Sequence, residues 1–169
     1  MNILVFSDSH GHPERMTEAF DKQIKKPDAV IFLGDGLGDV ARCSFGSANV
    51  YSVSGNCDYS YSFLMPPEEP TERIFEICGK RIMLTHGHRY SVKSGLGRIV
   101  AEAVKQNVDI LLFGHTHEKL ELYLPAGESD FGICLEKPLY VMNPGSVGAY
   151  PSSFGCIEIN PENVLISHG

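Results

Sequence analysis

Short apolar runs alternate along the chain with clusters of polar residues and glycine. The pattern occurs six times, with apolar runs at residues 3–6, 29–33, 50–53, 81–85, 110–113 and 139–142. Runs of this length are typical of strands that are buried on both faces, as in a parallel or mixed sheet. The sequence therefore predicts six such strands, each followed by a polar turn.

Helices are predicted between several of these strands. Residues 13–25 open with Pro13 and Glu14, which suit the first turn of a helix. Residues 92–106 carry apolar side chains at helical spacing, and a shorter helix is expected around residues 37–44. Together with the strands, these helices predict an α/β fold of two packed mixed sheets flanked by helices, in a single domain spanning residues 1–169.

Two hairpins and two loops complete the predicted layout. Residues 72–78 and 80–85 are expected to turn at Gly79-Lys80, and residues 154–159 and 164–167 at Asn160-Pro161-Glu162. Residues 59–70 and 125–138 are rich in proline, glycine and acidic side chains. These two stretches are expected to be surface loops.

Every predicted buried strand ends in a polar cluster beside a glycine. Six of the seven histidines lie in three of these clusters, as the pairs His10 and His12, His86 and His88, and His115 and His117. Ligands of α/β sheets bind at the carboxyl ends of the strands. We therefore expect the clusters to converge on one rim and to form a functional site.

The residue types in these clusters indicate a metal centre. The candidate ligands are Asp8, His10, Asp35, Asn56, His86, His115 and His117. Manganese is the first choice for this mixed nitrogen and oxygen set, and nickel, iron and zinc also fit. Seven donors exceed the needs of one tetrahedral ion and divide between two divalent ions bridged by a carboxylate, an arrangement that favours in-line attack at phosphorus.

Composition and charge narrow the classes of partner. The formal net charge of -7 argues against a broad electrostatic contact with nucleic acid, but a small phosphorylated substrate is compatible with it because bound cations supply positive charge. No apolar run approaches the ~20 residues that span a bilayer, and the N-terminus lacks a signal-peptide pattern, so we expect a cytoplasmic protein without a membrane segment. Five cysteines without a CxxC pair indicate neither disulfides nor a structural zinc site, and most are expected to be buried.

The polar clusters, taken in order, resemble the signature of a known family. They follow the pattern D-x-H, G-D, G-N, H, G-H-x-H of the calcineurin-like metallophosphoesterase superfamily, as Asp8-Ser9-His10, Gly34-Asp35, Gly55-Asn56, His86-Gly87-His88 and Gly114-His115-Thr116-His117. The segment Asn143-Pro144-Gly145-Ser146 extends the resemblance to the small bacterial and archaeal phosphodiesterase branch, and is expected to form a wall of the pocket. Five motifs in this order, each after a predicted strand, make the resemblance to this family specific.

The resemblance implies a four-layer α/β/β/α sandwich and a role for each matching residue. One metal ion would be held by Asp8, His10 and His117, the second by Asn56, His86 and His115, and both by a bridging Asp35. A hydroxide that bridges the two ions would attack a small phosphate ester directly. The implied function is a dinuclear-metal-dependent phosphoesterase, and specifically a phosphodiesterase.

One motif departs from the common family pattern. Many members have G-N-H-E, whose histidine can protonate the leaving group, whereas this chain has Gly55-Asn56-Cys57-Asp58. A neutral thiol is a poor substitute for an imidazolium. Three alternatives stay open: His88 or Asp58 serves as the acid, the leaving group needs no proton, or activity is low. The candidate catalytic residues are accordingly Asn56, His88 and Asp58.

Several candidate residues also have structural interpretations. Asp8 and Asp35 could be helix caps. His12 is expected at a helix start rather than at a metal ion, and His168 at the surface. For His88, a structural role and a substrate contact fit equally well.

The alternative function is a non-catalytic protein-binding scaffold of the same fold. The fold occurs in a eukaryotic retromer subunit that works mainly as a scaffold and has an altered metal site. All seven ligand positions are filled in this chain, which favours an enzyme. Whether the protein forms a homo-oligomer is left open.

Overall fold

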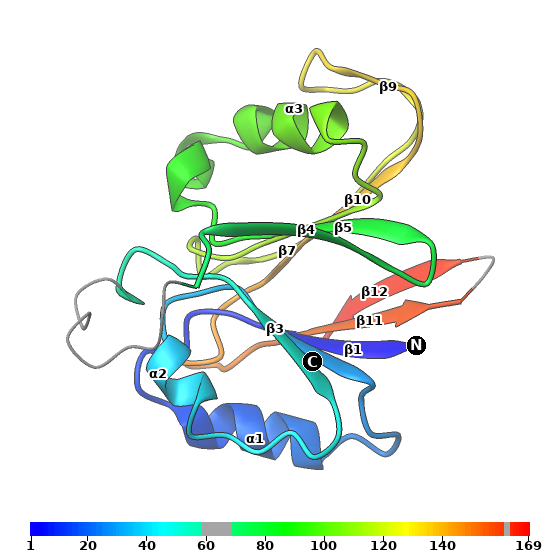
Figure 1. Cartoon of the computed structure of the whole chain (residues 1–169). Helices are drawn as coiled ribbons and strands as arrows, with labels where there is room; N and C mark the ends of the chain where they lie inside the picture. The colour runs from blue at the N-terminus through cyan, green and yellow to red at the C-terminus, as the bar shows by residue number, and fades with distance from the viewer. Residues whose placement is uncertain (59–68, 161–162) are drawn as a thin grey trace.

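Two five-stranded sheets packed face to face form the framework of the protein (Figure 1). The computed structural model describes residues 1–58, 69–160 and 163–169. Helices lie on the outer side of each sheet, so the order of layers is helix, sheet, sheet, helix. The predicted α/β class with two packed mixed sheets is confirmed.

The first sheet combines segments from both ends of the chain. Its strands are β1 (Asn2–Phe6), β2 (Ala29–Phe32), β3 (Asn49–Ser52), β11 (Gly155–Ile159) and β12 (Val164–His168), in the spatial order β12-β11-β1-β2-β3. β1, β2 and β3 are parallel, whereas β11 is antiparallel to both β1 and β12. The helices α1 (Pro13–Asp21) and α2 (Leu37–Val40) lie on the outer side of this sheet.

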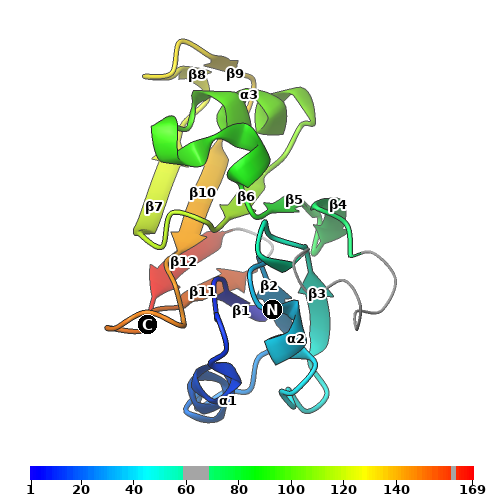
Figure 2. The same cartoon turned by 90° about the vertical axis from the view of Figure 1, so that its left-hand side faces the viewer.

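The second sheet has the same mixed character. Its strands are β4 (Glu72–Ile77), β5 (Lys80–Thr85), β6 (Ile110–Phe113), β7 (Lys119–Leu124) and β10 (Leu139–Pro144), in the order β4-β5-β6-β10-β7. β5, β6 and β10 are parallel, and the edge strands β4 and β7 are antiparallel to their neighbours. Its outer side carries the helix α3 (Gly97–Lys105), the 3-10 turns η2 (His88–Tyr90) and η3 (Val92–Ser94), and the small hairpin of β8 (Gly127–Glu128) and β9 (Cys134–Leu135) (Figure 2).

Alternating side chains of β1 show how the layers are held together. Ile3 and Val5 pack between the two sheets, in the same cluster as Leu112 of β6. Leu4 and Phe6 point the other way and pack in the cluster that includes the apolar side of α1. The central strands are thus buried on both faces, which explains why their apolar runs are continuous.

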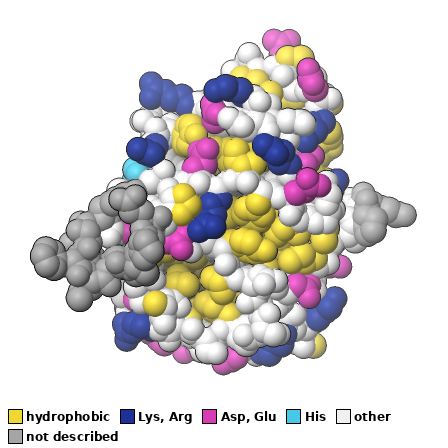
Figure 3. All heavy atoms as spheres, viewed as in Figure 1, with side chains coloured by type: hydrophobic (Ala, Val, Ile, Leu, Met, Phe, Trp, Pro, Cys, Tyr) yellow, Lys and Arg dark blue, Asp and Glu magenta, His cyan; other side chains and the backbone are white. Residues whose placement is uncertain are grey.

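The edge strand β3 departs from this pattern. Val50 is 45% exposed, so the prediction that residues 50–53 are buried on both faces is wrong at this strand. An edge strand has a strand neighbour on one side only, and β3 pairs with β2 alone in its sheet. Tyr51 stacks on Phe75 of β4 with ring centroids 4.6 Å apart. Apolar side chains gather across the middle of the face that Figure 3 shows.

The helices are shorter than predicted. α1 ends at Asp21 rather than at residue 25, and the Lys26 ammonium donates to the last carbonyl groups of the helix, at Phe20 O (3.2 Å) and Asp21 O (2.9 Å). α3 begins at Gly97 rather than at residue 92, because residues 92–94 form the 3-10 turn η3 and Gly95 has a positive φ angle, which breaks the helix. α2 is also shorter, with four residues.

The predicted hairpins, loops and cysteine environments agree with the structure only in part. Both hairpins are confirmed, although residues 161–162 of the second turn lie outside the described residues. Residues 59–68 of the predicted loop 59–70 also lie outside them, and the predicted loop 125–138 contains the β8–β9 hairpin. β7 was not predicted.

The expectation of mostly buried cysteines is wrong, because three of the five are exposed and lie in turns or in the small hairpin.

No helix in the described parts of the chain is long and apolar enough to cross a bilayer.

Replacing Leu112 by alanine tests the core between the sheets. Leu112 is fully buried, so we expect the free energy of unfolding to fall by about 2–5 kcal/mol through lost apolar contacts and a cavity. Leu165 on β12 is 55% exposed and is the matched control, for which alanine should cost less than about 0.5 kcal/mol. Urea unfolding followed by circular dichroism measures both. Equal losses in the two variants would contradict this description of the core.

Candidate metal centre

The carboxyl ends of the central parallel strands of both sheets meet at one rim, which faces the viewer in Figure 2. The first sheet contributes Asp8 after β1, Asp35 after β2 and residues 54–58 after β3, and the second sheet contributes His86 after β5 and residues 114–117 after β6. Backbone hydrogen bonds join neighbouring turns, from Asp8 N to Gly34 O at 2.9 Å and from Gly114 N to His86 O at 3.2 Å. The structure thus brings these polar clusters together.

A first group of candidate ligands comes from β1 and β6. Asp8, His10 and His117 each offer one ligand atom, and these atoms lie within 4.8 Å of one another. The Nε2 atoms of His117 and His10 are 3.1 Å and 3.7 Å from Asp8 Oδ1. The same two nitrogens are 3.4 Å apart. These three residues are the set that the family resemblance implies for one metal ion.

A second group adjoins the first. Asp35, His86 and His115 offer ligand atoms within 4.8 Å of one another. His86 Nε2 is 3.3 Å from Asp35 Oδ2 and 3.2 Å from His115 Nδ1, and it is 3.9 Å from Asp8 Oδ1 of the first group. His86 Nδ1 lies 2.8 Å from Leu33 O, and a bond there fixes the ring so that Nε2 faces the site.

The carboxylate of Asp8 provides a test of whether a cation fits here. Its Oδ2 accepts hydrogen bonds from Ser7 Oγ and from the backbone N–H of His115, whereas its Oδ1 is buried and forms no hydrogen bond with any residue that the structure describes. A buried carboxylate oxygen without a partner is costly. A divalent cation among the surrounding imidazole nitrogens would satisfy it, and this donor set suits manganese, iron, zinc or nickel. The residues present therefore fit a divalent metal.

Five of the candidate ligands have left-handed backbone conformations. Their φ angles are +55° at Asp8, +43° at His10, +60° at Asp35, +69° at His115 and +62° at His117. Such conformations cost of order 1–3 kcal/mol per residue and cluster at functional sites. The backbone of this rim is therefore shaped for the placement of the side chains rather than for its own stability.

Two glycines let the turns approach each other closely. A Cβ atom at Gly55 would lie 2.1 Å from Asp35 Oδ1, and one at Gly114 would lie 2.0 Å from Ser7 Oγ and 3.0 Å from Asp8 Oδ2. No side chain fits at either position. The glycines of the G-N and G-H motifs are thus explained by close packing around the two carboxylates.

Burial and mutual contacts shift the pKa values of the second group. Burial opposes ionisation of Asp35, but hydrogen bonds with His86 and the backbone N–H of Cys57 outweigh it and hold the pKa of Asp35 well below its usual value. Burial lowers the pKa of His86, but the contact with Asp35 outweighs it and leaves that pKa raised. Burial, His86 and Lys93 lower the pKa of His115 to about 4. Asp35 is thus a carboxylate and His115 a neutral imidazole at neutral pH, the forms that bind metal.

Asn56 and Cys57 follow β3 and are both exposed. Asn56 Nδ2 lies 3.2 Å from Cys57 Sγ, and within the described residues the Asn56 side chain has no hydrogen bond to either ligand group. Cys57 N donates to Asp35 Oδ1 at 2.7 Å. Burial and the nearby Asp35 raise the pKa of the Cys57 thiol to about 11. The structure therefore places the backbone of Cys57 directly against the Asp35 carboxylate.

Asp58, a candidate proton donor from the sequence, binds the turns together. Its Oδ2 accepts hydrogen bonds from Asp35 N and Gly55 N, each at 2.8 Å. Its Oδ1 accepts from Gly36 N at 2.8 Å and Leu37 N at 2.9 Å. Because both oxygens are engaged by buried or partly buried backbone donors, the geometry gives Asp58 a positioning role at the start of α2.

Two histidines next to the ligand motifs differ in their surroundings. The centroids of the His88 and His86 rings are 5.5 Å apart, and Nδ1 of His88 is buried and has no hydrogen-bond partner within residues 1–58, 69–160 and 163–169. Burial and His86 lower the pKa of His88. His12 is the N-cap residue of α1 and lies 3.1 Å from Glu14, as expected at a helix start. The N-cap of α2 is Gly36, so neither aspartate ligand is an N-cap.

Residues of the N-P-G-S motif form hydrogen bonds with the turns that make up the rim. Asn143 Nδ2 donates to Gly114 O at 2.8 Å and to Thr116 Oγ1 at 3.0 Å. Ser146 Oγ donates to Asp8 O at 2.8 Å. The motif, expected as a wall of the pocket, thus holds the backbone of the turns that carry the candidate ligands.

Other supporting residues were missed from the sequence. The expectation that His168 lies at the surface is wrong, because its side chain is 11% exposed and its ring nitrogens lie 2.6 Å from Glu121 Oε1 and 2.7 Å from Asn143 O. Asp39 Oδ2 accepts hydrogen bonds from Ser9 Oγ and Gly11 N, both at 2.7 Å. Both partnerships join residues far apart in the sequence, and no local pattern signals them.

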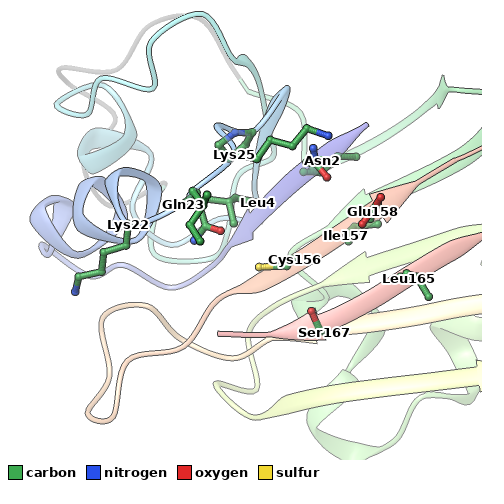
Figure 4. A pocket seen from close by; sticks show the side chains of 13 residues that line it. Asn2, Leu4, Lys22, Gln23, Lys25, Cys156, Ile157, Glu158, Leu165 and Ser167 are labelled. Carbon is green, nitrogen blue, oxygen red and sulfur yellow. The ribbon is translucent and has the colours of Figure 1, made fainter.

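A separate groove lies at the other end of β1. It has a volume of about 480 Å³ and is lined by β1, the segment after α1, and strands β11 and β12 (Figure 4). Its charged lining residues include Lys22, Lys25 and the single carboxylate Glu158, and it contains no histidine. This donor set does not suit a metal ion, so the rim is the candidate site.

Comparison with known proteins adds to this geometry. The family model of the calcineurin-like phosphoesterase superfamily domain matches residues 1–162. A probable metallophosphoesterase of Bacillus subtilis is 29% identical over 117 residues, which cover 69% of this chain and 64% of that protein. The match therefore spans slightly less than two thirds of the length of this relative.

Solved structures share the fold. Vps29 of Entamoeba histolytica in complex with zinc has a TM-score of 0.67 at 21% identity, covering 100% of this chain and 98% of that one. An archaeal phosphodiesterase has a TM-score of 0.67 at 22% identity, covering 99% of each chain. These similarities support the metallophosphoesterase architecture.

Replacing Asp58 by asparagine tests its positioning role. The amide group would present N–H to backbone N–H donors, so we expect the free energy of unfolding to fall by about 1–3 kcal/mol. The exposed Asp130 is the control, for which asparagine should change stability by less than about 0.5 kcal/mol. Denaturant unfolding of metal-free protein measures both. An Asp58→Asn variant as stable as the wild type would contradict the positioning role.

Proposed function

Because the chain belongs to the calcineurin-like phosphoesterase superfamily, we propose that it is a phosphodiesterase that hydrolyses small phosphate diesters with two divalent metal ions. The observation that carries the proposal is the pair of adjoining ligand groups around the carboxylates of Asp8 and Asp35. The motifs G-N-C-D and N-P-G-S, which resemble the small phosphodiesterase branch, support a diester substrate.

Each ligand group would hold one ion. The residues of the first are Asp8, His10 and His117, and those of the second are His86, His115 and Asn56, with Asp35 shared. Manganese is the proposed ion for a set of imidazole, carboxylate and amide donors. Two bound ions would supply the nucleophilic water and neutralise the charge that develops on the phosphoryl oxygens.

The protein's own groups prepare this chemistry before substrate binds. Asp35 is held ionised by its hydrogen bonds, and His86 is held in orientation by Leu33 O. No side-chain reorganisation at these two residues is then needed when the ions and the substrate arrive. Such preorganisation is a main source of electrostatic catalysis.

We propose His88 as the proton donor to the leaving group. Its ring lies 5.5 Å from that of His86 and 6.2 Å from that of His115, so it borders the second ligand group. Burial and His86 lower its pKa in the substrate-free protein, and an anionic phosphoryl group nearby would raise it again. The proton would be held at a ring nitrogen and delivered to the departing oxygen.

Hydrolysis of bis(p-nitrophenyl) phosphate and p-nitrophenyl phosphate tests the function. Chelator-treated protein should be inactive and should regain diester hydrolysis with manganese. An Asp35→Asn variant should lose about a hundredfold or more of that activity, because a shared ligand is lost. The control is His12→Ala, which lies outside both ligand groups and should retain activity. Two bound ions without turnover of either substrate would favour the non-catalytic scaffold.

A series of diesters with leaving groups of different basicity tests His88. The His88→Gln variant should lose about 10²- to 10⁴-fold with an alkyl leaving group, which needs a proton. With p-nitrophenolate, which leaves without one, the loss should stay below about tenfold. Initial rates at fixed pH give both values. An equal loss with both substrates would assign His88 to phosphate contact instead.

A further inference from the structure

A third set of donor atoms lies at the junction of the two ligand groups. His10, Asp35 and Cys57 each offer one ligand atom, and these atoms lie within 4.8 Å of one another. His10 belongs also to the first group and Asp35 to the second. The sulfur of Cys57 is therefore close to donors of both proposed ions, although the family pattern assigns no ligand to this position of the chain.

The turn after β3 holds Cys57 in this place. Its backbone N–H donates to Asp35 Oδ1 at 2.7 Å, which ties it to the carboxylate shared by the two ions. Asn56 Nδ2 lies 3.2 Å from the sulfur and donates to it. Because Cys57 is also exposed, an ion can reach it without rearrangement of the core.

We propose that Cys57 is a sulfur ligand of the metal centre and makes it select zinc or cobalt over manganese. Thiolate is a soft ligand that prefers zinc to the harder manganese ion. On binding, the S–H bond breaks, a metal–sulfur bond forms and the proton passes to solvent. The inference rests on the proposed metal centre and changes its expected occupant.

Cobalt(II) titration of chelator-treated protein, followed by absorption spectroscopy, tests the proposal. A sulfur-to-cobalt charge-transfer band in the near ultraviolet should appear in the wild type and vanish in Cys57→Ser, while the visible bands of bound cobalt persist. The matched control is Cys78→Ser, which changes another exposed cysteine, outside the three donor groups, and should keep the band. In competition, Cys57→Ser should lose at least about tenfold in zinc affinity relative to manganese.

The outcomes separate this inference from the proposed function. Bound cobalt without a charge-transfer band in the wild type, or a band that survives in Cys57→Ser, overturns the role of Cys57 and leaves the metal centre in place. A wild-type protein that binds no cobalt, zinc or manganese overturns both proposals.

A second measurement needs no variant. Alkylation by iodoacetamide, read by mass spectrometry, should slow at Cys57 by about tenfold or more when zinc is added, and should not slow at Cys78 or Cys134, which are also exposed. Unchanged alkylation of Cys57 in zinc-bound protein would contradict the proposal.

Discussion

The rim is organised around one constraint, the buried Oδ1 of Asp8, which has no hydrogen-bond partner in the described part of the chain. Three imidazole nitrogens lie within 4 Å of this oxygen, one from the turn after β1 and two from turns of the second sheet. Because Asp8 belongs to the first sheet, this arrangement exists only when the two sheets are docked. The packing of apolar side chains between the sheets thus determines whether the site can form.

The conformation of this rim reduces the stability of the folded protein locally. Left-handed residues, an unsatisfied carboxylate oxygen and closely spaced histidines all oppose folding in the absence of a ligand. A cation that binds the folded state alone would offset these terms by mass action. Hydrogen bonds from outside the ligand set hold the geometry meanwhile, through Asp58 to the turns after β2 and β3 and through Asn143 to the turn after β6.

The sequence predicted correctly those features that depend on neighbouring residues in the chain. Continuous apolar runs identified the central strands, and the Asp and His clusters behind them are the residues that meet at the rim. β7 was missed although its alternating sequence K-L-E-L-Y-L is typical of a half-buried strand. The partners of Asp58 and His168 could not be predicted, because each contact joins segments that only the fold brings together. For the same reason, the hydrogen bond from the backbone N–H of Cys57 to Asp35 could not be predicted.

The composition of the first sheet has a consequence for how the chain folds. β1 lies between β2, made soon after it, and β11, which is separated from it by the whole second sheet in sequence. During synthesis, one edge of β1 therefore stays unpaired until the strands of the second sheet and then β11 have emerged. Such non-local pairing slows folding and leaves a hydrophobic strand open to other chains. The nascent protein is thus most vulnerable to aggregation just before β11 and β12 are added.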